Sequence, residues 1–392
     1  MIKKTADDPF TFGDNTGQRL SKKAQLFIHI GTHKTGTTSI ERVLRQYRNE
    51  LRKEGLVYLP LPPEVNQFQP LKELDVEIIK SYKKNLNRQI KENQRRENRD
   101  IRFLMSYEGF SGNPLTGYNN AGIIAEHLKQ ITDNMDVCII VYLRRQDNFL
   151  ESMYTQEVHE GESYSFESFL ENSSAFSFDW ERFLSCYCDH FGRENIVVRR
   201  YDKAFLPESD SLLKDFFNIL GIDIQKIVSQ NNIPALNRGY SRDTLEIARL
   251  SNPYLNRVER RRLRRILQQT SSKKSFERYS YWSDDDKDRF FAQYSESNGA
   301  VAREYFNEAS GLLFPYQAHN NGSQEYQGLS LEAVTAILVK AMLAENQTQT
   351  ESIIVRIIAK AERKVIALLK KFPWLMSKLR NLRRKMGSGR KN

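Results

Sequence analysis

The sequence predicts an α/β fold, in which a parallel β-sheet is flanked by helices and followed by a mostly helical C-terminal extension. Helical patterns separate the predicted strands, and this alternation indicates a parallel sheet with helices on both faces. In such sheets ligands bind beyond the carboxyl ends of the strands. Four short runs of β-branched and aromatic residues, each bounded by polar segments, are predicted to be these buried strands: residues 26–30, 101–107, 137–143 and 195–201.

The segments between and after these strands complete the predicted domain. Residues 78–100 are densely charged, and we expect a solvated helix or insertion there rather than a part of the acceptor site. Helices are predicted over 212–220, ending at Gly221, and over 284–306. The Asn-, Gln- and Gly-rich residues 316–328 are typical of a linker. The predicted organisation is therefore a main domain over 20–315, a linker over 316–328 and a basic helical tail over 329–392.

The net charge of +11 belongs to this tail. Residues 353–392 hold thirteen Lys and Arg against one Glu, whereas the rest of the chain is almost neutral. Residues 353–372 form an amphipathic basic pattern that favours equally an anionic membrane surface and a protein partner. No nucleic-acid recognition motif accompanies the charge, so nucleic-acid binding is not expected.

Composition and the N-terminal sequence indicate the cellular location of the protein. Of the residues, 39% are hydrophobic and 28% are charged, as in soluble globular proteins. The first twenty residues lack the apolar stretch of a secretory signal, and no transmembrane helix is expected. The three cysteines lack the paired spacing of a zinc site. We therefore expect a cytoplasmic protein that could attach at the inner face of the membrane.

The first predicted strand runs into a loop that is suited to an anion. Gly31 and Gly36 flank Lys34 in this loop. Hydroxyl residues then lead into an amphipathic helix, namely Thr35, Thr37, Thr38 and Ser39. Small residues let backbone N–H groups approach an anion, a helix N-terminus adds partial positive charge, and lysine adds a full charge. The predicted sheet is therefore of the P-loop type.

The spacing of this loop differs from that of ATP-dependent kinases and ATPases. In their pattern, G-x-x-x-x-G-K-[ST], the lysine follows the second glycine, whereas Lys34 precedes Gly36. Mg²⁺-dependent enzymes of that class usually place an acidic metal ligand after another strand, but residues 137–143 are followed by Arg144 and Arg145. The pattern favours an anionic donor that is bound without a metal ion.

Residues 31–39, GTHKTGTTS, resemble the donor loop of the PAPS-dependent sulfotransferases, and of their bacterial members in particular. That family holds the 5′-phosphosulfate of 3′-phosphoadenosine 5′-phosphosulfate (PAPS) in a modified P-loop. The resemblance implies that Lys34 contacts the phosphosulfate and its bridging oxygen. It also implies that the cradle is completed by Gly31, His33, Thr35, Gly36, Thr37, Thr38 and Ser39. Softer patterns extend the similarity over about residues 26–315.

The second signature of this family is an arginine at a strand end, followed eight residues later by a serine. Both hold the 3′-phosphate, and Arg144 and Ser152 match them here. Arginine suits this role because its planar guanidinium donates two hydrogen bonds to one phosphate.

Sulfuryl transfer to an alcohol also needs a base that removes the acceptor proton. Glu108 follows the second predicted strand, and similar bacterial and Golgi-type sulfotransferases carry a glutamate near this place. His33 and His159 remain alternative bases. By analogy with bacterial relatives, the expected acceptor is a hydroxyl group on a carbohydrate.

Two other function classes stay open at this point. One is a nucleotide-dependent P-loop kinase, which would bind ATP with Mg²⁺ through the same loop. The other is a catalytically silent protein that keeps the donor fold and acts as an adaptor for a membrane or a partner through its tail.

Overall fold

The computed structural model describes the chain in nine segments, namely residues 10–11, 23–61, 76–97, 99–173, 178–206, 212–227, 240–271, 281–315 and 328–340. The chain divides into two compact units, one from residues 1–237 and 274–326, the other from 238–273 and 327–392. Residues 316–327 of the predicted linker and the predicted basic helix over 353–372 lie outside the described residues.

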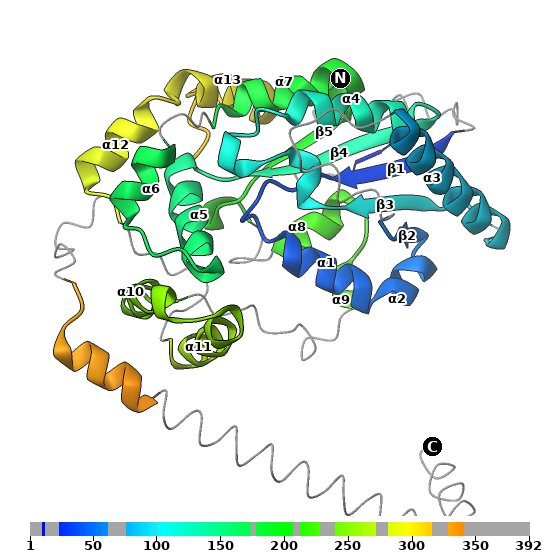
Figure 1. The fold of residues 1–392 in the computed structure, drawn as a ribbon. Helices are drawn as coiled ribbons and strands as arrows, with labels where there is room; N and C mark the ends of the chain where they lie inside the picture. The colour runs from blue at the N-terminus through cyan, green and yellow to red at the C-terminus, as the bar shows by residue number, and fades with distance from the viewer. Residues whose placement is uncertain are drawn as a thin grey trace, which may run out of the picture. The chain divides into compact units, whose positions relative to one another are not determined.

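The first unit is built on a five-stranded parallel sheet (Figure 1). Its strands lie in the order β2-β3-β1-β4-β5, so β1 is central and β2 and β5 are the edges. Their bounds are β1 Ala24–His29, β2 Leu56–Tyr58, β3 Arg102–Ser106, β4 Met135–Leu143 and β5 Ile196–Arg200. The predicted α/β class is confirmed, and each of the four predicted strands is present.

Helices cover both faces of this sheet. Figure 1 shows α4 and α7 along one face and α1 and α8 along the other. Helix α3 packs against α4, and α13 packs against α7. The helices of this unit are α1 Thr37–Gln46, α2 Arg48–Lys53, α3 Val76–Arg96, α4 Ala121–Thr132, α5 Gln146–Glu160, α6 Phe166–Ser173, α7 Trp180–Phe191, α8 Leu212–Ile219, α9 Ile224–Ile227, α12 Asp284–Ala292 and α13 Ser295–Phe306.

Helix α1 is fixed to the sheet by an apolar stripe. Ile40, Val43 and Leu44 recur at the spacing of one helical face, and all three are buried. They belong to a core cluster that includes Phe27 of β1 and Phe216 of α8. Because the stripe begins one turn into the helix, the N-terminus of α1 is held at the carboxyl end of β1.

The second unit is helical where it is described. It contains α10 (Arg242–Ser251), α11 (Arg257–Thr270) and a helix over residues 331–340. Helix α11 starts with a capping box between Asn256 and Glu259, which satisfies backbone N–H groups at the helix start. Among the described residues, no helix is long and apolar enough to cross a membrane.

Candidate functional site

The loops after β1 and β4 leave the sheet in opposite directions. After β1 the chain runs through α1 and α2 to β2 at one edge, and after β4 it runs through α5, α6 and α7 to β5 at the other edge. Because β1 and β4 are neighbours, Gly31 and Arg144 emerge side by side. In parallel α/β sheets, this switch point is where ligands bind.

The loop between β1 and α1 is held by its own hydroxyl groups. Thr32 Oγ1 donates to the carbonyl oxygen of Tyr142 in β4 at 2.6 Å, and Thr35 Oγ1 donates to the carbonyl oxygen of Thr32 at 2.5 Å. Lys34 has a φ of 65° and Gly36 a φ of 85°, so the backbone turns through the left-handed region twice. The Thr35 side chain therefore stabilises the loop, and its N–H remains to face a ligand.

Four successive backbone N–H groups of this loop donate no hydrogen bond to any described residue. They belong to Thr35, Gly36, Thr37 and Thr38, at the start of α1. Gly36 is the N-cap residue, and no side chain caps the helix. The hydroxyl oxygen of Thr37 is also buried without a hydrogen-bond partner in the described part of the chain. Unsatisfied donors at a helix N-terminus form a site that favours an anion.

The conformation of Gly36 gives a stability prediction. An alanine at position 36 would have to adopt a φ of 85°, and its Cβ would lie 2.4 Å from Leu212 Cδ2. We expect Gly36→Ala to lower the free energy of unfolding by about 1–3 kcal/mol, as for other residues forced into sparsely populated backbone regions. Urea denaturation followed by circular dichroism measures this change.

Gly122 in α4 provides the matched control for that substitution. A Cβ at Gly122 would meet only Cys186 Sγ at 3.8 Å, and its φ is not in the left-handed region. Gly122→Ala should therefore leave stability unchanged or raise it by up to about 1 kcal/mol, because alanine favours helix. An equal loss of unfolding free energy in the two variants would contradict the backbone strain expected for alanine at position 36.

Lys34 contacts the segment that follows β4 at two points. Its Nζ donates to Gln156 Oε1 of α5 at 3.3 Å, and its carbonyl oxygen accepts from Arg144 Nη1 at 2.9 Å. Arg144 therefore fixes the backbone of the loop whose lysine would meet the anion. Gln156 was not predicted from the sequence, since a glutamine inside a helix carries no motif.

Arg144 contacts this loop directly, and Ser152 lies in α5, which follows Arg144 along the chain. The carbonyl oxygen of Arg144 accepts from Trp180 Nε1 at 3.0 Å, and its guanidinium lies 5.8 Å from the ring centre of Tyr201. Ser152 lies in α5, four residues before Gln156, so the two side chains share one face of the helix. Because Gln156 contacts Lys34, this face of α5 is the one turned toward the loop.

Glu108 begins a 3₁₀ turn, η2 (Glu108–Ser111), immediately after β3. Ser111 Oγ bridges the turn to the loop, since it lies 2.7 Å from the carbonyl oxygen of Glu108 and 3.3 Å from that of Gly31. Burial raises the pKa of the Glu108 carboxyl, and the charge of Lys34 partly lowers it again. The contacts of Ser111 thus tie the turn that carries Glu108 to the start of the loop that carries Lys34.

A second carboxylate, Glu41, lies in the same neighbourhood. Its side chain is 15% exposed and forms an ion pair with Arg45 at 2.5 Å. Burial raises the pKa of Glu41, Arg45 lowers it, and the charge of Glu108 raises it further. Tyr58, at the end of β2, also has its pKa raised by burial and by Glu41. Glu41 stands on α1 outside any motif, so sequence reasoning missed it.

The two alternative bases lie in different places, and His33 is poorly suited to accept a proton. Burial and the charge of Lys34 lower the pKa of His33 to about 4, which makes it a weak base near neutral pH. The His33 backbone N–H donates to Tyr118 Oη at 3.1 Å, and its ring Nδ1 lies 3.4 Å from the same oxygen. His159 is half-buried near the C-terminal end of α5. His33 is therefore better placed to position the loop than to accept a proton.

Comparison with known proteins gives limited matches. No family model matches the chain. An uncharacterized protein from Archaeoglobus fulgidus is 32% identical over 170 residues, which is 43% of this chain and 45% of the archaeal protein. The match thus spans less than half of either protein. Among solved structures, a sulfotransferase from Alicyclobacillus acidocaldarius is similar over 62% of this chain and all of that chain, with 16% identity and a TM-score of 0.35.

Proposed function

We propose that the chain is a sulfotransferase that moves a sulfuryl group from PAPS to a hydroxyl group, most simply one on a carbohydrate. The observation that carries this proposal is the uncapped start of α1. There, four backbone N–H groups without described partners lie beside Lys34 at the carboxyl end of the central strand. Such a site favours a doubly charged phosphosulfate over a neutral ligand.

The residues of the site fit both ends of this donor. Lys34, the N–H groups of Thr35 to Thr38 and the buried Thr37 hydroxyl would hold the phosphosulfate. Arg144 and Ser152 would hold the 3′-phosphate. Arg144 donates through Nη1 to the loop carbonyl, and its planar guanidinium is a type of group that binds phosphate oxygens well.

Each side chain then has a distinct chemical task. PAPS supplies an activated sulfuryl group whose leaving group is adenosine 3′,5′-bisphosphate. Lys34 and the loop N–H groups stabilise the negative charge that grows on the departing phosphate. Glu108 accepts the proton of the attacking hydroxyl, and its burial-raised pKa makes it a stronger base than an exposed glutamate. Gln156 holds the lysine in place.

Calorimetric titration with adenosine 3′,5′-bisphosphate tests the donor site without requiring the acceptor. We expect micromolar binding by the intact chain, and a roughly tenfold or greater loss in both Lys34→Ala and Arg144→Ala, because each substitution removes a charge-assisted hydrogen bond to phosphate. Lys53→Ala, which removes an exposed lysine of α2, should bind as the unmodified protein does.

The same titration separates the alternatives. Binding of ATP with Mg²⁺ in place of the bisphosphate would overturn the sulfotransferase assignment in favour of a kinase. Bisphosphate binding with no transfer of ³⁵S-sulfate from labelled PAPS to any glycan or alcohol in a broad panel would favour the silent adaptor. If the chain bound neither adenosine 3′,5′-bisphosphate nor ATP with Mg²⁺, the assignment of this loop as a donor site would be wrong.

A further inference from the structure

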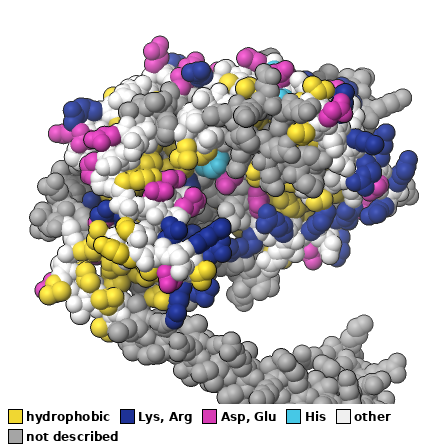
Figure 2. Space-filling model, in the orientation of Figure 1, with side chains coloured by type: hydrophobic (Ala, Val, Ile, Leu, Met, Phe, Trp, Pro, Cys, Tyr) yellow, Lys and Arg dark blue, Asp and Glu magenta, His cyan; other side chains and the backbone are white. Residues whose placement is uncertain are grey.

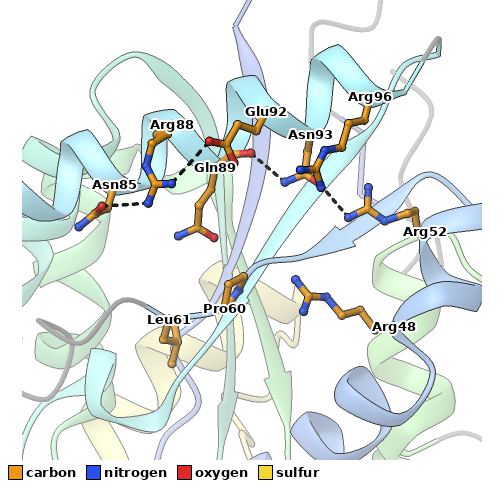
Figure 3. A pocket seen from close by; sticks show the side chains of 10 residues that line it. All are labelled: Arg48, Arg52, Pro60, Leu61, Asn85, Arg88, Gln89, Glu92, Asn93 and Arg96. Carbon is orange, nitrogen blue, oxygen red and sulfur yellow. Dashed lines mark hydrogen bonds and ion pairs between the residues drawn. The ribbon is translucent and has the colours of Figure 1, made fainter.

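A strongly basic pocket lies at the β2 edge of the sheet. Its volume is about 430 Å³, it is open to solvent, and it is bordered by α2, by α3 and by Pro60 and Leu61, which follow β2 (Figure 3). Because β2 is parallel to β1, the residues after β2 lie on the same rim of the sheet as the loop of Lys34. Figure 2 shows Lys and Arg side chains gathered on the side of the molecule where Figure 1 places α2 and α3.

The charges of the pocket are poorly balanced. Four arginines line it against the single carboxylate of Glu92. Two are engaged: Arg52 pairs with Glu97 at 3.0 Å, and Arg88 lies 3.5 Å from Glu92.

The guanidinium groups of the other two arginines, Arg48 and Arg96, make no hydrogen bond or ion pair with any residue that the structure describes, and both residues are exposed. Figure 3 shows the Arg48 side chain extending from α2 toward Pro60. Within the described part of the chain, the pocket therefore keeps two guanidinium groups without an acidic partner.

The remaining lining is polar. Three amide side chains, Asn85, Gln89 and Asn93, project from α3 (Figure 3). Asn93 accepts from Arg52 and donates to the carbonyl oxygen of Gln89, and Asn85 accepts from Arg88, so two of the amides help to hold the arginines in place. The Gln89 amide can donate to and accept from a hydroxyl group. None of the ten lining residues is aromatic, so the pocket offers no ring on which a nucleotide base could stack. A sugar that carries a carboxylate, sulfate or phosphate suits this combination of an amide and arginines.

The sheet places this pocket and the candidate donor site on one rim. Strands β2, β3 and β1 are parallel neighbours, so Pro60 and Leu61 after β2, Glu108 after β3 and the loop of Lys34 after β1 leave the sheet at the same end. An extended glycan with one residue in the pocket would run along this rim toward Glu108.

We propose that the pocket between α2 and α3 binds an anionic sugar residue of the acceptor, through Arg48 and Arg96, and so selects acidic glycans over neutral ones. This inference rests on the proposed sulfotransferase function and names its substrate class. It also assigns a binding role to α3, which the sequence had indicated as a solvated element.

The test is a glycan array probed with the full chain in the absence of donor. The array carries uronate-containing, sulfated, phosphorylated and neutral oligosaccharides, and the uronates are also printed as their methyl esters. We expect binding to acidic glycans and none to the esters. For the preferred glycan, Arg48→Ala/Arg96→Ala should weaken binding at least about tenfold, the effect of removing two charge-assisted hydrogen bonds.

Lys53→Ala/Arg95→Ala is the matched control, because it removes one exposed cation from α2 and one from α3 outside the pocket. It should keep binding within about twofold, as expected for surface charges that make no specific contact. Both variants keep the basic residues 353–392. Any binding of acidic glycans to that tail is therefore the same in both and does not affect the comparison.

Three results would overturn the inference. They are an equal loss of glycan binding in the two double variants, no preference for acidic glycans, or displacement of the preferred glycan by inorganic sulfate at the concentration at which the free glycan displaces it. Calorimetry with adenosine 3′,5′-bisphosphate on the same variants keeps the two proposals apart. The pocket variants should bind the bisphosphate normally. A failure of bisphosphate binding in the unmodified chain would count against the donor site, whereas a failure on the array would count only against the pocket.

Discussion

Replacing Lys34 with alanine is expected to lower kcat/KM for sulfuryl transfer by roughly a hundred- to a thousandfold, the range seen when one donor that stabilises transition-state charge is removed. The physical reason is that Lys34 Nζ would be the only full charge contributed by the loop to the departing phosphate. Its position is fixed by Gln156 at 3.3 Å and by the hydrogen bond from Arg144 to its carbonyl oxygen. Initial rates with labelled PAPS measure this effect.

Gln156→Ala is the informative companion to this substitution. This substitution leaves the lysine in place but removes the contact that positions Nζ. The loss of kcat/KM should therefore be smaller, about tenfold, as for one lost hydrogen bond to a charged group. A Lys34→Ala enzyme that retained full activity would show that the loop takes no part in transfer. Thermal unfolding of both variants should match that of the unmodified chain, because Lys34 is not part of the core.

Replacing Glu108 with glutamine is expected to lower kcat by roughly a hundred- to ten-thousandfold, which is the usual contribution of a general base. Glutamine keeps the size of the side chain and its place in η2 but cannot accept the acceptor proton. Binding of adenosine 3′,5′-bisphosphate should therefore be retained. Glu50→Gln, an exposed change on α2, provides the control.

The pH dependence of the reaction gives a second test of Glu108. A base must be deprotonated to act, so activity should rise as the pH rises through the pKa of Glu108. Burial raises this pKa, which places the acid limb of the kcat/KM profile above the pH at which an ordinary glutamate titrates. The limb should vanish in Glu108→Gln. An unchanged acid limb in that variant would assign the base role to another group.

The fold was largely predictable because its strongest signals are local. Buried parallel strands leave long apolar runs, and the loop of Lys34 carries its chemistry within nine consecutive residues. Strand β2 was missed because Leu56–Tyr58 is too short to show any period. Residues 284–306 were predicted as one helical stretch, whereas Gln293 and Tyr294 divide it into α12 and α13.

The site was less predictable wherever it depends on contacts between distant segments. Gln156 approaches Lys34 across 122 positions of sequence, and no pattern marks it. Glu41 is an ordinary charged position of α1 until its burial beside Glu108 is known. The charged face of α3 was also predictable only in part. Its periodicity indicates solvent exposure, but it cannot show that α2 borders the same pocket.

The hydrogen bond from Arg144 to the carbonyl oxygen of Lys34 makes the two motifs mutually dependent. A loop transplanted alone into another parallel sheet would lack the guanidinium that holds its backbone in the left-handed turn at φ 65°. A transferable unit would have to include both neighbouring strands, β1 and β4, with their following residues. Drift in the loop sequence would likewise be tolerated only where the strand-end arginine still reaches the same oxygen, so the two motifs are expected to covary as one inherited module.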